Sequence, residues 1–128
     1  MSSGQPIMGI NSGSIFLGNV WWNTSGTKKF MNFNNLADWA KKTGQEMLNG
    51  HFTGMQADPK FVGPLVTGIT DPYELDKLYG FTLQPDSPLR NKGLDLRSIP
   101  GMVRPVRDFF GNQVPMGAAA EPGIYEMK

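Results

Sequence analysis

Glycine and proline constrain this chain more than any other feature of its sequence. The 128 residues include 16 glycines and 10 prolines, about a fifth of the chain, whereas the two together usually make up about 12% of a protein. Glycine adds backbone freedom, and proline removes a main-chain N–H group, so both interrupt regular elements. Turns and irregular loops are therefore expected to dominate the fold.

Size and charge exclude several classes of protein. A chain of 128 residues fits one domain with one core, because domains split only at about 250 to 300 residues. The 12 Lys and Arg nearly balance the 11 Asp and Glu, for a net charge of +1, and the charges are scattered. Such a surface does not attract a polyanion, so nucleic acid is not expected as a partner. No apolar run reaches the roughly 20 residues that span a bilayer, so a membrane is not expected either.

The sequence of this segment leaves the cellular compartment open. Cysteine is absent, which excludes disulfides and thiolate chemistry but is compatible with any compartment. Met1–Gly13 lacks the basic start and the apolar stretch of a signal peptide. An export signal is therefore expected upstream of this segment if the protein is secreted.

The first part of the chain carries the strongest β signal. Residues 1–13 are rich in glycine and serine and predict a flexible entry. Residues 15–17 and 20–22 are short apolar and aromatic runs. They are separated by Gly18-Asn19, a pair that turns the chain easily. Two three-residue strands with a corner between them are more typical of a solenoid rung than of a hairpin.

A first short helix is predicted from about Asn35 to Thr43. Asn34 or Asn35 supplies the N-cap, and Gly44 ends the helix. The spacing i, i+3, i+4 places an apolar stripe on one face, formed by Leu36, Trp39 and Ala40.

A second short helix is predicted to begin at Asp71-Pro72, an acidic cap followed by the residue best tolerated at the first helical position. It ends at Gly80, and the stripe expected to be buried consists of Leu75, Leu78 and Tyr79. Short strands and turns follow from Phe81 onward, with a last strand predicted at Ile124–Glu126.

A set of short motifs follows in a characteristic order. The motifs are Gly-Asn-Val-Trp-Trp-Asn at 18–23, the helix with Thr-Gly-Gln-Glu at 35–46, Asp-Pro-Lys-Phe at 58–61, the segment with Gln-Pro-Asp-Ser-Pro at 81–93, and Arg-Pro-Val-Arg-Asp-Phe-Phe-Gly-Asn at 104–112 followed by Gly-Ile-Tyr-Glu at 123–126. In this order they resemble the C-terminal closing segment of secreted right-handed parallel β-helix proteins, the pectate-lyase-like group of polysaccharide lyases and glycoside hydrolases. The chain departs from that pattern at residues 118–122, where an Asp is usual.

The resemblance implies a mostly β fold: the end of a right-handed parallel β-helix with two short helices and an irregular, Gly/Pro-rich C-terminal cap. It divides a single domain or fragment of residues 1–128 into a flexible entry at 1–13, the last β rungs at 14–33, and a helical and irregular cap at 34–128. The catalytic residues of such proteins lie on upstream rungs, so no catalytic residue is transferred to this chain. An extracellular or periplasmic location is implied for the parent.

Four side chains are candidates for binding a substrate. A flat aromatic ring can stack on a sugar, and Trp21 and Trp22, as neighbours on a strand, face opposite ways, so one should be buried and the other exposed. Arg104 and Arg107 are suited to recognising the carboxylates of acidic sugars. The structural alternatives are a Trp packed beneath a loop and an Arg–Asp108 ion pair that fixes the tail.

For the other candidate residues, a structural role explains the sequence better than a catalytic or metal-binding role. Carboxylates at turns usually bind nearby main-chain N–H groups, and acidic residues in the first turn of a helix complement its dipole. The carboxylates expected at turns are Asp58, Asp86, Asp95 and Asp108. The acidic residues expected in the first turns of a helix are Asp71, Glu74 and Asp76. His51 is the only histidine, and a metal site needs several ligands. No catalytic residue, metal or cofactor is therefore predicted.

Three hypotheses of function follow. The first is a structural cap of a carbohydrate-active β-helix, which docks on upstream rungs through Ser14–Trp22 or associates with a second copy, because a solenoid needs an atypical final unit. The second is a glycan-binding module, which requires a solvent-facing Trp and an oligosaccharide as ligand. The third is a fragment of a lyase or hydrolase, which requires converging carboxylates separated by roughly 5 to 9.5 Å.

Overall fold

The computed structural model describes residues 13–127. The predicted flexible entry at residues 1–13 lies outside the described residues, except for Gly13. The chain divides into two compact units, Met1–Asp58 and Pro59–Lys128, called here the N-terminal and the C-terminal unit.

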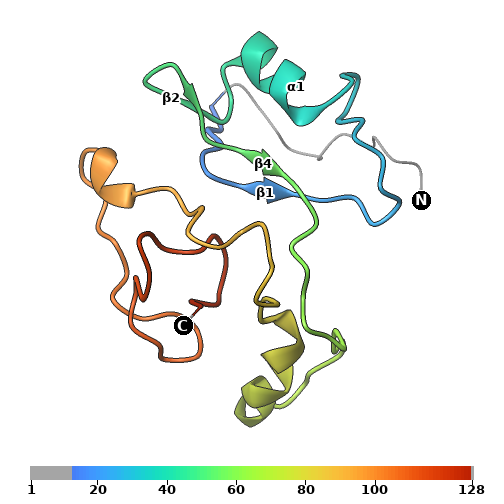
Figure 1. Cartoon of the computed structure of the whole chain (residues 1–128), viewed down its shortest axis with the longest axis vertical. Helices are drawn as coiled ribbons and strands as arrows, with labels where there is room; N and C mark the ends of the chain where they lie inside the picture. The colour runs from blue at the N-terminus through green and yellow to red at the C-terminus, as the bar shows by residue number, and fades with distance from the viewer. Residues whose placement is uncertain (1–12, 128) are drawn as a thin grey trace. The chain divides into compact units, whose positions relative to one another are not determined.

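Regular structure is sparse in both units (Figure 1). The N-terminal unit contains β1 (Val20–Trp21), α1 (Leu36–Thr43), β2 (Met47–Leu48), β3 (His51–Phe52) and β4 (Met55–Gln56). The C-terminal unit contains two 3₁₀ helices, η1 (Pro72–Phe81) and η2 (Leu96–Ser98). Loops and turns connect these elements throughout, as the content of glycine and proline predicted.

The predicted fold class, a mostly β chain forming the end of a right-handed parallel β-helix, is wrong. Each strand described between residues 13 and 127 has two residues, and the strands form two-stranded sheets, β1 with β4 and β2 with β3. Within the segment predicted to form rungs, residues 14–33, β1 is the strand that forms. Glycine and proline recur too often for longer ladders, so turns and side chains satisfy many main-chain groups instead.

Helix α1 confirms the first helix prediction. The Asn35 side chain accepts a hydrogen bond from the Asp38 N–H at 2.8 Å and caps the N-terminus. Gly44 ends the helix in a left-handed conformation, with φ of 75°, which a residue without a side chain adopts without strain. The predicted face is buried, and it consists of Leu36, Trp39 and Ala40.

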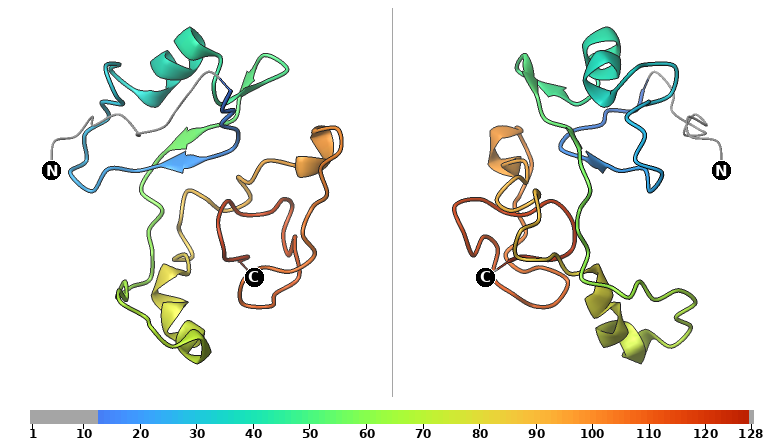
Figure 2. Two further views of the ribbon diagram at one scale, coloured as in Figure 1. Left: turned by 180° about the vertical axis from the view of Figure 1, so that it is seen from behind. Right: turned by 45° about the vertical axis from the view of Figure 1, so that its right-hand side comes forward.

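The parallel pair β1–β4 lies beside α1 in every view (Figure 1 and Figure 2). Val20 pairs with Met55, and Trp21 pairs with Gln56. Rings from four segments pack around this pair with centroids 4.9 to 6.4 Å apart. This aromatic cluster consists of Phe16, Trp21, Phe30 and Trp39, and it forms the core of the N-terminal unit together with the buried face of α1.

Strands β2 and β3 form a hairpin that the sequence analysis missed. They are antiparallel and are joined by Asn49-Gly50, both with positive φ, 51° and 79°. An Asn-Gly pair is the strongest short signal for a two-residue hairpin turn. The Asn-Gly pair was present in the sequence, but the sequence analysis did not interpret it as a hairpin turn.

The C-terminal unit is built on an antiparallel contact between residues 60–63 and residues 80–84. The Val62 N–H donates to the Thr82 carbonyl oxygen at 2.9 Å, and the Gly63 N–H donates to the Gly80 carbonyl oxygen at 2.8 Å. Gly80 is required there, because a Cβ at this position would lie 1.9 Å from the Pro64 carbonyl oxygen.

Helix η1 begins as predicted, but it differs from the predicted helix in type and in burial. Asp71 caps it through the Tyr73 N–H at 2.9 Å. It is a 3₁₀ helix with non-helical backbone angles at Glu74, so a stripe spaced for an α-helix does not stay on one face. Leu75 is 42% exposed and Tyr79 is 62% exposed, which shows that the prediction of a buried stripe is wrong.

The predicted last strand at Ile124–Glu126 is also absent from the described chain. The Phe109 N–H donates to the Ile124 carbonyl oxygen at 3.1 Å, but no ladder continues from this bond. Side chains hold this segment, as the next section describes.

Candidate functional site

Glu46 is the polar centre of the N-terminal unit. Its side chain is fully buried. Its Oε1 accepts hydrogen bonds from Asn19 Nδ2 at 2.7 Å and from Trp21 Nε1 at 3.0 Å. Its Oε2 accepts from the Asn19 N–H at 3.3 Å and from Thr53 Oγ1 at 3.4 Å. These bonds tie β1 and the approach to β4 to one carboxylate.

The two predicted tryptophans have different surroundings. Trp21 belongs to the aromatic cluster and donates its indole N–H to Glu46, so its ring is packed and its polar atom is used. Trp22 is 44% exposed. Trp21 is half-buried instead of buried as predicted, and Trp22 follows the end of β1. Trp22 is the member of the pair that can meet a ligand.

The outer edge of β1 is open. The Met55 N–H donates to the Asn19 carbonyl oxygen at 2.9 Å, and in a parallel ladder this bond directs the N–H and the C=O of Val20 away from β4. Among residues 13–127 no group pairs with them. The sequence has no charged residue before Lys28, whereas exposed edges are usually protected by charge or proline.

Three carboxylates form the polar centre of the C-terminal unit, and together they are called here the carboxylate cluster: Asp108, Glu121 and Glu126. Glu126 is 2% exposed and Glu121 is 7% exposed. The main-chain N–H of Glu126 donates to Asp108 Oδ2 at 2.7 Å, and the N–H of Glu121 donates to Glu126 Oε2 at 3.3 Å. The main-chain N–H groups of Glu126 and Glu121 therefore link the three residues in series.

The remaining donors to the carboxylate cluster come from distant parts of the unit. Glu121 accepts from the N–H groups of Asn91 and Met127, each at 2.7 Å. Glu126 accepts from the Met116 N–H at 2.8 Å. The cluster therefore holds the end of the chain against residues that lie as many as 30 positions earlier.

Asp108 also closes its own turn, as expected for an Asp at this position. Its Oδ1 accepts from the Asn112 N–H and its Oδ2 from Asn112 Nδ2, each at 2.8 Å. Burial raises the pKa of Asp108, but hydrogen bonds from Asn112, Glu126 and Phe110 outweigh it and hold the pKa below its ordinary value. Burial raises the pKa of the neighbouring Tyr125, and the charges of Tyr79, Asp108 and Glu121 add to this effect.

The two predicted arginines lie in the C-terminal unit, whereas the two tryptophans lie in the N-terminal unit. Arg107 Nη1 donates to the Gly111 carbonyl oxygen at 2.8 Å. Asp108 binds Asn112 and Glu126 instead, so Arg107 binds a carbonyl oxygen four residues away and does not form the expected ion pair. Arg104 is half-buried, and its charge contributes to the lowered pKa of Asp95.

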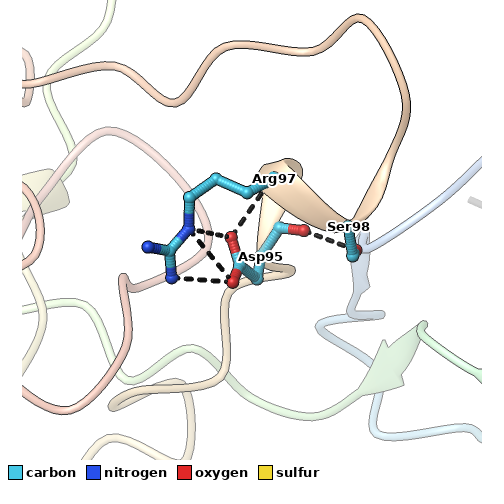
Figure 3. A network of polar contacts seen from close by, with 3 residues as sticks. All are labelled: Asp95, Arg97 and Ser98. Atoms are coloured by element: carbon cyan, nitrogen blue, oxygen red, sulfur yellow. Dashed lines mark hydrogen bonds and ion pairs between the residues drawn. The ribbon is translucent and has the colours of Figure 1, made fainter.

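Asp95 caps η2 (Figure 3). Its Oδ1 accepts from the Arg97 N–H at 3.0 Å, and the Arg97 guanidinium binds both carboxylate oxygens. The Ser98 hydroxyl donates to the Asp95 carbonyl oxygen at 2.6 Å. The side-chain hydrogen bonds from Arg97 are the largest cause that lowers the pKa of Asp95 to about 2. This carboxylate also has a structural role.

Two of the motifs from the sequence analysis pack against each other. Residues 59–61 lie beside residues 81–87, where Ser87 Oγ donates to the Pro59 carbonyl oxygen at 2.7 Å. The rings of Phe61 and Phe81 meet at 5.7 Å. Lys60 pairs with Asp86, and this pairing lowers the pKa of Asp86.

Residues 13–127 contain no group of three or more His, Cys, Asp or Glu side chains placed to hold a metal ion. His51 lies exposed on β3. Within the same residues, no helix has the length and the apolar character needed to cross a membrane.

Comparisons with family models, with curated proteins and with solved structures found no match. The resemblance to β-helix proteins therefore rests on the motifs alone.

Sequence reasoning did not predict the central roles of Glu46, Glu121 and Glu126. Glu46 and its donors Asn19 and Trp21 are 25 to 27 positions apart. No local sequence pattern predicts hydrogen bonds between residues so far apart, and the donors to Glu121 and Glu126 are main-chain groups. The structural role of Asp108 could be predicted, because its hydrogen-bond partner in the turn is only four residues away.

Proposed function

We propose that this chain is a structural closing segment of a larger polysaccharide-processing protein of the pectate-lyase-like group, and that it performs no chemistry alone. The chain itself is not a β-helix, so the proposal concerns the protein on which it docks. The observation that supports this proposal most directly is the structural role of the carboxylates that belong to the motifs. The oxygens of Asp108 and Glu126 accept hydrogen bonds from the chain's own main chain, which suits them to holding a fold.

The distribution of apolar side chains supports a docked partner. Among residues 13–127, seven hydrophobic residues are buried, whereas fifteen large hydrophobic side chains are exposed, with Ile15 at 80% and Trp22 at 44%. Exposed apolar side chains that form a contiguous patch are typical of an interaction surface. Ile15 precedes Val20 by five residues, and Trp22 directly follows β1.

The open edge of β1 supplies the point of attachment. An added strand would accept from the Val20 N–H and donate to its carbonyl oxygen, and it would extend the parallel pair of β1 and β4. Parallel sheets occur almost always as larger sheets with covered faces, so a pair of two-residue strands is a fragment of a sheet. We assign the missing strand to upstream polypeptide of the parent protein.

A proline substitution at the open edge tests this proposal. Val20→Pro removes an N–H that has no partner in the described chain, so the thermal stability of the 128-residue chain should change little. In the parent protein, extended upstream of Met1, the same substitution removes a hydrogen bond and should lower the melting temperature. Proline is tolerated on a free strand edge but not on a paired one.

The control is Met55→Pro, which removes the bond to Asn19 and should destabilise both the short chain and the parent protein. Equal melting temperatures for the parent protein with and without the Val20→Pro substitution would contradict docking at this edge.

A second candidate function is glycan binding, which the exposure of Trp22 favours. Titration with neutral and acidic oligosaccharides should shift the tryptophan emission of the wild-type chain, and Trp22→Ala should abolish the shift. Phe52→Ala, at a side chain of matching exposure, 45%, should preserve it. A wild-type chain that shows no shift with either class of sugar would exclude this function.

The third hypothesis, a lyase or hydrolase fragment, gains no support from the carboxylate cluster. Glu121 and Glu126 are buried, and both oxygens of each accept main-chain hydrogen bonds. A general acid or base must reach the substrate, and these groups face the protein.

A further inference from the structure

Within residues 13–127, neutral N–H donors supply the hydrogen bonds that hold the carboxylate cluster. Its three side chains receive seven hydrogen bonds, of which six come from main-chain N–H groups and one from Asn112 Nδ2. The ion pairs within residues 13–127 join other side chains. Neutral dipoles therefore supply all seven of these hydrogen bonds to the three carboxylates.

Each carboxylate of the cluster uses both oxygens as acceptors. A proton from the solvent must therefore attach to an oxygen that already faces an N–H group. A carboxylate accepts charge-assisted hydrogen bonds that are about twice as strong as neutral ones. Protonation weakens the existing hydrogen bonds, because the carboxyl group is then neutral. It also places an O–H donor next to N–H donors, and a buried donor without an acceptor lowers the stability of the fold.

We infer that residues 108–127 form an acid-sensitive closure: loss of the carboxylate acceptors of the cluster in acid releases the C-terminal segment from its unit while the N-terminal unit remains folded. The segment is especially dependent on these bonds because it contains no helix or named strand. The N-terminal unit depends on a single carboxylate, Glu46, and it has α1 and the aromatic cluster in addition.

The direction of the effect follows from the charges that face the cluster. The pKa of Asp108 lies below its ordinary value, so its stabilising contribution is complete above that ordinary value and is lost as the pH falls through the lowered pKa. The charges of Asp108 and Glu121 also act on Tyr125, whose pKa is raised first by burial, so its phenol is neutral at acidic pH. The arginine beside Asp108, Arg107, binds the Gly111 carbonyl oxygen.

The chain carries separate spectroscopic reporters for its two units. All three tryptophans lie in the N-terminal unit, and all three tyrosines lie in the C-terminal unit. A pH titration of the full chain from neutral pH to about pH 3, below the ordinary carboxylate range, followed by two-dimensional NMR, should first remove the dispersed amide signals of Asn91, Met116, Glu121 and Met127. The indole signals of Trp21 and Trp39 should persist.

Substitution of a single carboxylate imitates the protonated state at neutral pH. Glu126→Gln replaces an acceptor oxygen by an NH₂ group among N–H donors and should release the same amides at neutral pH. Glu74→Gln, at an exposed glutamate paired with Lys77, is the matched control and should leave them unchanged.

Two results would overturn the inference. One is retention of the four amide signals both in wild type at the acidic end and in Glu126→Gln. The other is loss of the Trp21 and Trp39 indole signals at the same pH as the amides, or in Glu126→Gln itself, because acid would then unfold the whole chain.

Discussion

Glu46 shows how a single side chain can organise the N-terminal unit. It accepts from Asn19, Trp21 and Thr53, so one buried carboxylate fixes both β1 and the loop before β4. Gly54 is part of the same arrangement, because a Cβ there would lie 2.9 Å from Glu46 Cγ. A buried charge is tolerated only when its hydrogen bonds are made, and here both oxygens are used.

Glu46→Gln should destabilise the N-terminal unit. The substitution retains the shape of the side chain, but it replaces one acceptor oxygen by a donor that faces Asn19 or Trp21, and an unsatisfied buried donor costs about 1 to 3 kcal/mol. Urea unfolding followed by tryptophan emission measures the loss. Glu74→Gln serves as the exposed control, and equal midpoints for both variants would contradict the role of Glu46.

At the scale of elements, short-range signals predicted local structure well. The Asn cap and the Gly44 stop predicted α1, and Asp71-Pro72 predicted the start of η1. The type of η1 and the exposure of its apolar residues were not predictable from spacing, because a 3₁₀ helix repeats every three residues. The main error was to interpret short apolar runs as rungs of a β-helix. A run of three residues does not determine which strand it pairs with.

The cap of η2 gives a direct test of the electrostatics. Asp95 should titrate with a pKa of about 2 because Arg97 binds both of its oxygens. Arg97→Gln should return the pKa toward its ordinary value of 3.8. A lowered folded-state pKa means that the contribution of Asp95 to stability is present above about pH 4 and is lost as the pH falls toward about 2.

Carboxyl ¹³C chemical shifts across this pH range measure both values for Asp95. Identical titration curves for wild type and Arg97→Gln would show that the bidentate contact is not the cause of the lowered pKa.

At the scale of the whole chain, there are two units, and each contains a buried polar centre in addition to its apolar residues. Composition predicted the prevalence of turns, and the charge balance gave no reason to expect a polyanion-binding surface. The sequence did not predict the polar centres. The donors to Glu121 and Glu126 are main-chain groups that every residue possesses, and Asn19 and Trp21 lie 25 to 27 positions from Glu46. The motifs that suggested β-helix proteins contribute Asp108 and Glu126 to one centre, and β1 presents an open edge in the other unit.

The central claim is that this chain closes a larger protein, and the coding region upstream of Met1 tests it most directly. Transcript sequencing combined with mass spectrometry of the native protein would determine whether translation continues into this segment. The proposal predicts a continuous product with several hundred upstream residues rich in β-strand patterns. A native product that begins at Met1 behind its own start signal would contradict it.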